Sequence, residues 1–188
     1  MMQQHTIAGN TVYSFKDSDS LLLNKLLGNG NRVYKKYMEI YNRDNFSYFR
    51  TPHTMNPKST GPGYQFEPEN RELKLEFEKY ICSILNTELK IVLEIRDMWY
   101  LFQTNEAWVQ NPPHIHLTAN MIAVMYLQLG SNDTIQFYDA ENNFESYNPS
   151  LGEIVFFNGD VIHKPGPSTE GTRISVNAEL NTPLEISY

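Results

Sequence analysis

The chain has 188 residues, a formal net charge of -7 at pH 7 and one cysteine, Cys82. This length suits a single domain, residues 1–188, that buries roughly 70% of its unfolded surface. A lone cysteine excludes disulfides and thiolate-rich metal clusters within one chain, and the acidic balance opposes tight binding to nucleic acid, which depends on clustered lysine and arginine.

The amino terminus and the hydropathy predict a cytoplasmic protein without a membrane span. Residues 1–6 have neither the basic flank nor the apolar core of a signal peptide. The longest apolar stretch, residues 121–126, is far shorter than the ~18 residues needed to cross a bilayer. The basic residues Arg32, Lys35 and Lys36 have the helical spacing of a solvated helix face.

The amino-terminal part, residues 1–87, is predicted to be helical and irregular. Asp17 and Ser18 can cap a helix that runs to Leu27, and the Gly-Asn-Gly sequence at 28–30 is expected to end it. Repeated proline and glycine breaks predict an irregular loop, of which residues 51–64 could form a lid.

A second helix is predicted from Pro68 to about Asn86. Apolar residues recur there at three- and four-residue spacing, which indicates packing against a sheet: Leu73, Phe77, Tyr80, Ile81 and Ile84.

The carboxy-terminal part, residues 88–188, is predicted to be a β-sandwich or barrel. Short runs rich in β-branched and aromatic residues are separated by Asn, Gly and Pro turns. The expected strands are residues 89–95, 98–103, 121–129, 134–138, 144–147, 152–157 and 173–180.

Three histidines in this part predict a metal site. His114 and His116 are separated by one residue, so on an extended strand both imidazoles point to the same face. His163 is the candidate third ligand, because it follows the expected buried strand at 152–157 and precedes a Lys-Pro-Gly-Pro sequence at 164–167 that should form a turn. Neutral imidazole suits Zn, Fe, Cu and Ni.

Arg173 lies ten residues beyond His163. Its guanidinium offers a rigid fork that suits a carboxylate. On a strand, Arg173, Ser175 and Asn177 share one polar face, and apolar residues occupy the other. This polar face is expected to line a site for an acid.

The carboxy-terminal half resembles the 2-oxoglutarate- and Fe(II)-dependent oxygenases, and is most similar to their prolyl-4-hydroxylase-like branch. The residues that carry the resemblance are Trp108, 113–116, 125–127, 152–163 and 173–177. It implies a mainly β fold with flanking helices, a double-stranded β-helix or cupin-like jelly-roll, which holds Fe(II) and takes 2-oxoglutarate as cosubstrate.

By position, the resemblance makes His114 and His163 iron ligands. Arg173 would bind the far carboxylate of 2-oxoglutarate, with Tyr126 as a hydrogen-bond donor and Ser175 and Asn177 on the same face. The resemblance concerns the iron site and leaves the substrate, a small molecule or a peptide, unassigned.

His116 departs from the family pattern, because most members have Asp or Glu there. Three neutral histidines leave a divalent ion with charge +2, whereas two histidines and a carboxylate leave +1. Either His116 ligates directly, or a carboxylate such as Asp139 or Asp160 substitutes, or water or an anion fills the position. Strand geometry favours direct ligation by His116.

Two other functions fit the pattern. A cupin with a three-histidine metal site shares the architecture, although the glutamate usual four or five residues beyond its HxH motif is replaced here by Asn120 or Met121. A jelly-roll can also be a non-catalytic binding protein, since the fold alone fixes no function.

Overall fold

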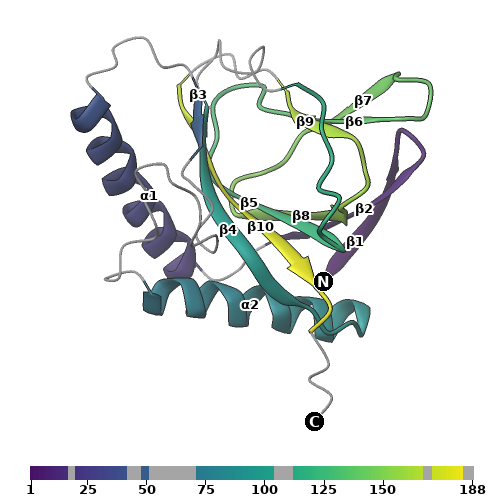
Figure 1. The fold of residues 1–188 in the computed structure, drawn as a ribbon, viewed down its shortest axis with the longest axis horizontal. Helices are drawn as coiled ribbons and strands as arrows, with labels where there is room; N and C mark the ends of the chain where they lie inside the picture. Colours follow the sequence, from purple (N-terminus) through teal and green to yellow (C-terminus); the bar gives the residue numbers. More distant parts are fainter. Residues whose placement is uncertain (17–19, 42–47, 51–70, 104–111, 167–170, 184–188) are drawn as a thin grey trace.

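A computed structural model describes residues 1–16, 20–41, 48–50, 71–103, 112–166 and 171–183. Its strands form two antiparallel sheets that face each other beside two helices (Figure 1). In spatial order the large sheet contains β1 (Met2–Ile7), β2 (Asn10–Lys16), β8 (Glu153–Asn158), β5 (Met121–Gln128), β10 (Arg173–Asn181), β4 (Glu94–Gln103) and β3 (Tyr48–Arg50). The small sheet contains β7 (Phe144–Tyr147), β6 (Ile135–Tyr138) and β9 (His163–Pro165).

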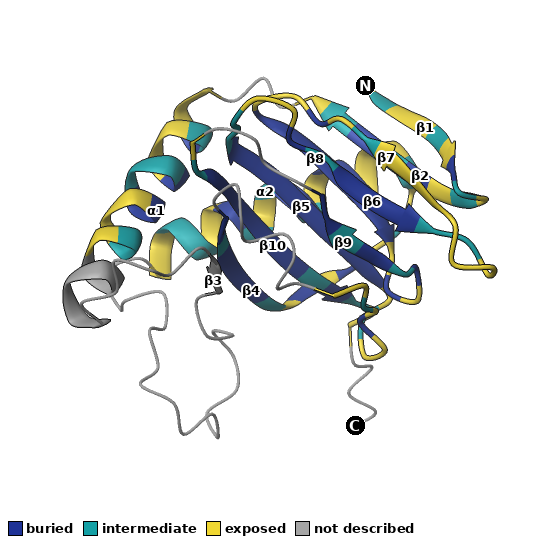
Figure 2. Ribbon diagram, turned by 90° about the horizontal axis from the view of Figure 1, so that it is seen from above, coloured by how far each residue is buried: buried dark blue, intermediate teal, exposed yellow. Residues whose placement is uncertain are grey.

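The large sheet is buried on both faces, as the dark blue of its central strands shows in Figure 2. Along β5, Ala123 and Met125 pack toward the helices, whereas Ile122, Val124 and Tyr126 pack toward the small sheet. Successive residues of a strand point to opposite faces. A strand between two apolar layers is therefore apolar at every position, which explains the unbroken run at 121–127.

Helix α1 (Ser20–Tyr41) extends well beyond the predicted end at Gly28 to Gly30, so that prediction was wrong. The Asn29 side chain donates a hydrogen bond of 3.0 Å to the buried Tyr100 hydroxyl. A Cβ on Gly30 would lie 3.1 Å from the Tyr100 ring. The glycine thus allows close approach of the helix to the sheet, and this packing outweighs the local tendency to stop.

Helix α2 (Arg71–Leu89) confirms the second predicted helix and buries Phe77, Ile81, Ile84 and Leu85. The strand predicted at 89–95 was wrong over most of its length, because α2 continues to Leu89 and residues 90–93 belong to no strand. β4 instead runs unbroken from Glu94 to Gln103. Neither helix of the described part of the chain is long and apolar enough to cross a membrane.

Two further strand assignments were missed. Lys164 and Pro165, expected to begin a turn, belong to β9, which pairs with β6. Residues 2–16 form the β1–β2 hairpin, and β2 extends the large sheet by pairing with β8. The hairpin was not predicted because its polar residues hide the alternation, whereas its inward residues Ile7 and Val12 join the core between the sheets.

We predict that Phe156→Ala lowers the free energy of unfolding by about 3–5 kcal/mol, because it removes a fully buried ring and leaves a cavity between the large sheet and the helices. Phe144→Ala is the matched control, since that ring is 54% exposed. Its cost should stay within about 0.5 kcal/mol. Urea denaturation of both variants measures the difference, and equal costs would contradict the assigned core.

Candidate metal centre

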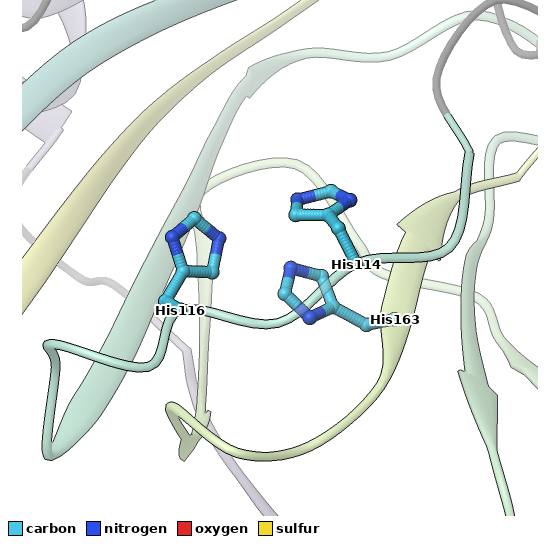
Figure 3. A group of neighbouring side chains, drawn as sticks. All are labelled: His114, His116 and His163. Atoms are coloured by element: carbon cyan, nitrogen blue, oxygen red, sulfur yellow. The ribbon is translucent and has the colours of Figure 1, made fainter.

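Three histidine side chains converge at one end of the space between the sheets (Figure 3). One nitrogen from each of His114, His116 and His163 lies within 4.8 Å of the others. His116 and His163 are buried and His114 is partly buried. The sequence prediction thus selected three residues that the fold brings together from two distant segments.

Backbone pairing brings the two segments together. His114 and His163 exchange two hydrogen bonds of 3.0 Å, from the amide of each to the carbonyl of the other. The pair is an isolated bridge rather than part of the extended strand expected for residues 114–116. Pro112 and Pro113 precede it, and proline cannot donate to a strand ladder.

A second contact fixes His116 against the turn that leads to His163. The His116 amide donates a 2.7 Å hydrogen bond to the Gly159 carbonyl. A Cβ on Gly159 would lie 2.1 Å from the Ala119 carbonyl oxygen and 2.7 Å from that of His116. The close approach therefore requires glycine at this position.

Each imidazole is oriented through its Nδ1 atom. Nδ1 of His114 lies 3.0 Å from the Pro112 carbonyl oxygen, and Nδ1 of His163 lies 2.9 Å from that of Val161. A carbonyl only accepts hydrogen bonds, so both Nδ1 atoms carry a proton, and in the neutral ring the lone pair is then on Nε2. Nδ1 of His116 lies 2.7 Å from a carboxylate oxygen of Glu179.

The most buried of the three imidazoles, that of His163, is held neutral by its surroundings. Burial and the neighbouring His114 lower the pKa of His163 to about 3, although the hydrogen bond to Val161 opposes the shift. His163 is therefore uncharged at neutral pH, as a metal ligand must be. Neutral rings whose other nitrogen is held by an acceptor are typical of metal-binding histidines. The donor set fits a divalent transition metal.

The two carboxylates considered as substitutes lie elsewhere. Asp139 accepts hydrogen bonds from the Asn143 side chain and from the backbone amides of Asn143 and Glu141, which lowers the pKa of its carboxyl group. Asp160 is exposed in the turn after Asn158, as its turn-forming sequence indicated. Among the described residues, the side chains that are grouped closely enough to hold a metal ion are the three histidines.

A cavity of about 220 Å³ extends from the histidines between the sheets. Its polar lining includes Arg173, Tyr126, Ser175 and Asn177, all of which the sequence analysis selected. Its apolar lining consists of Trp99, Leu101, Pro112, Ile122, Val124, Ile135 and Pro165. This volume lies below the roughly 300–1,000 Å³ of drug-sized pockets, so the cavity suits a small ligand.

Arg173 places a buried positive charge in the cavity. Its side chain is 2% exposed. The guanidinium donates to the Thr134 carbonyl at 2.7 Å and to Oε1 of Gln103, whose own amide donates to the Gly166 carbonyl at 2.9 Å. These partners fix the direction of the fork. A guanidinium held in this way presents a rigid fork that suits a carboxylate ligand.

The predicted polar face of β10 is confirmed. Ser175 and Asn177 line the cavity, whereas Ile174 and Val176 pack with the helices. Nδ2 of Asn177 is buried and has no hydrogen-bond partner among the residues that the structure describes. Tyr126 lies opposite Ser175 on β5, and burial raises the pKa of its hydroxyl group, so that group stays protonated.

Sequence reasoning missed Glu179 and Gln103. Glu179 continues the alternation of Arg173, Ser175 and Asn177, so its position on the polar face of the strand could have been predicted from the sequence. Gln103 ends β4 opposite Arg173, a pairing that only the fold reveals. Trp99 lines the cavity, Tyr100 packs in the core beneath α1, and Trp108 and residues 51–64 lie outside the described residues.

No protein-family model and no curated protein matches the chain. Solved structures do. AviO1 from Streptomyces viridochromogenes Tue57 is 11% identical over 97% of this chain and 90% of its own, with a TM-score of 0.64. HygX from Streptomyces hygroscopicus, solved with nickel and 2-oxoglutarate bound, is 9% identical over 95% and 84%, with a TM-score of 0.61.

A viral collagen prolyl hydroxylase from Paramecium Bursaria Chlorella virus-1, solved as a 2-oxoglutarate complex, is 12% identical over 92% of this chain and 96% of its own, with a TM-score of 0.59. At such identities the likeness concerns the fold. It confirms the predicted double-stranded β-helix, a mainly β jelly-roll with flanking helices.

We predict that the protein binds one Co(II) or Zn(II) ion and that His163→Ala abolishes this binding, because it removes the most buried nitrogen of the cluster. His5→Ala is the matched control. That histidine lies on β1, where its ring nitrogen contacts the Ser14 hydroxyl at 2.8 Å. Calorimetric titration measures both, and unchanged binding in His163→Ala would contradict the assigned centre.

Proposed function

We propose that this protein is a 2-oxoglutarate- and Fe(II)-dependent oxygenase that couples oxidative decarboxylation of 2-oxoglutarate to oxidation of a second substrate. One observation carries the proposal: a single cavity has three convergent imidazoles at one end and a buried arginine fork at the other. A small dicarboxylic acid that chelates a metal through its keto-acid end needs both. The HygX and viral hydroxylase complexes, which share the fold, support this choice of cosubstrate.

In this proposal His114, His116 and His163 hold Fe(II). All three are neutral nitrogen donors, and imidazole suits iron. Three ligands on one side leave positions for the cosubstrate and for O2. Fe(II) with bound 2-oxoglutarate supplies the activation of O2. The protein's own side chains bind and orient 2-oxoglutarate and shield the metal site from water.

Arg173 binds the far carboxylate of 2-oxoglutarate. Gln103 and the Thr134 carbonyl hold its guanidinium in place, so little side-chain freedom is lost when the ligand binds. Tyr126 and Ser175 lie on adjacent strands beside it and supply hydroxyl donors. Nδ2 of Asn177, which has no partner among the described residues, supplies an amide donor. These donors favour an anionic ligand along the part of the β10 polar face that runs from Arg173 to Asn177.

The apolar lining excludes water from the reacting end of the cavity. Trp99 lies against the His116 ring, with centroids 5.8 Å apart, and Ile122 and Val124 line the same space. Exclusion of water limits side reactions of the activated metal site. We further propose that residues 1–188 act as one domain, that the chain belongs to the prolyl-4-hydroxylase-like branch, and that the substrate is a small molecule or a peptide.

A three-histidine metalloprotein of the cupin type that does not use 2-oxoglutarate is the second candidate. The observation in its favour is the cluster itself, which contains three neutral donors and no carboxylate among the described residues. The arginine at the far end of the cavity favours the oxygenase.

We predict that the anaerobic protein with Fe(II) and 2-oxoglutarate develops the visible charge-transfer band of the chelate. Arg173→Met should weaken 2-oxoglutarate binding at least tenfold, because it removes the charge that faces the far carboxylate. Arg96→Met is the matched control, since Arg96 is exposed and donates to the Thr118 carbonyl. Metal binding without a band would favour the cupin-type protein.

A further inference from the structure

Glu179 contacts one of the three histidines from outside the cluster. Its carboxylate lies 2.7 Å from Nδ1 of His116, and the two side chains are 12% and 8% exposed. It is the next inward residue of β10 after Asn177. The other two histidines contact neutral backbone carbonyls at the corresponding atom. Among the three rings, His116 thus has a distinct, anionic partner.

We propose that Glu179 is a positioning residue that supplies, through His116, the negative charge that a carboxylate ligand would otherwise bring to the metal. The inference rests on the proposed function, in which the cluster holds a divalent ion. In a site with a carboxylate ligand the negative charge contacts the metal directly, whereas here the imidazole of His116 separates the charge from the metal.

The hydrogen bond fixes the state of the ring. A carboxylate accepts but does not donate when ionised, so Nδ1 of His116 carries a proton, and Nε2 is the nitrogen left to bind a metal. The bond is charge-assisted and shielded from water, which makes it stronger than its two carbonyl counterparts. It therefore raises the electron-donating power of this ligand above that of the other two.

The charge balance follows. Three neutral imidazoles leave a divalent ion with its full charge in a buried site, which is unfavourable without a counter-ion. With Glu179 counted, the site has the same net charge as one built from two histidines and a carboxylate. His116 and Glu179 therefore act together: the histidine binds the metal, and the glutamate supplies the negative charge that a histidine ligand lacks.

If His116 and Glu179 act together, an aspartate at position 116 should be unfavourable as long as Glu179 is present. The oxygen atoms of an aspartate at this position are bonded to Cγ, as Nδ1 of His116 is, so one of them would lie near the present Nδ1 and close to the Glu179 carboxylate. Two carboxylates at such a distance cannot both be ionised. His116→Asp alone should therefore produce a poor site, although it recreates the family's usual ligand set.

The experiment is a double-mutant cycle read by Co(II) affinity, with a competing chelator and without 2-oxoglutarate. Glu179→Gln keeps an acceptor for Nδ1 but removes the charge, and we expect it to weaken Co(II) binding about 10- to 100-fold. In the His116→Asp background the same change should strengthen binding at least tenfold, because the amide can donate to the new carboxylate. The sign of the effect thus reverses with the residue at 116.

Asp97→Asn is the matched control, because Asp97 lies opposite Glu179 on β4 and also carries a carboxylate. It should leave Co(II) affinity within twofold. Circular dichroism of each metal-free variant identifies any that does not fold. If Glu179→Gln is among them, the cycle is run with Glu179→Ala, which also removes the charge.

Two results would overturn the proposal: Glu179→Gln acting in the same direction in both backgrounds, or Asp97→Asn acting as strongly as Glu179→Gln. Either leaves the proposed function intact as long as the wild-type protein binds Co(II) and forms the chelate with 2-oxoglutarate. Failure of the wild-type protein to bind metal would instead remove the proposed function itself.

Discussion

The alternation of side chains along β10 is the constraint on which the rest of the structure depends. The strand lies in the middle of the large sheet, between β5 and β4. Its even-numbered residues from Ile174 to Leu180 pack beneath the helices, and its odd-numbered residues from Arg173 to Glu179 face the cavity or the histidines. A shift of one residue would exchange the two sets. Stability of the core and correct placement of the polar groups are therefore inseparable.

This coupling explains how one small cavity can hold a positively charged group and a group of metal-binding histidines at fixed positions. The Arg173 end attracts an anion, and the histidine end holds neutral donors with an acidic residue behind them. Arg173 and Glu179 lie on one strand, so the separation between the arginine and the acidic residue behind His116 is set by the rise of the backbone. A flexible loop could not keep that separation constant.

The metal centre was largely predictable from sequence because its signals are local. The spacing of His114 and His116 and the polar alternation after Arg173 each lie within a few residues. Features that depend on a residue far away in the sequence could not be predicted. Gly30 suggested a helix end when in fact it allows contact with Tyr100, and β9 lies among prolines. Gln103 gains its role only by pairing with Arg173, and Glu179 shared the alternation but pointed to no ligand until His116 lay beside it.

The packing of Gly159 against the backbone of residues 116–119 has an evolutionary consequence. The turn and the HxH segment touch through main-chain atoms, so no compensating side-chain change can make room for even one methyl group. Position 159 is thereby closed to single substitutions, whereas the neighbouring exposed Asn158 and Asp160 are open to them. Relatives of this chain should vary freely on either side of a glycine that does not vary.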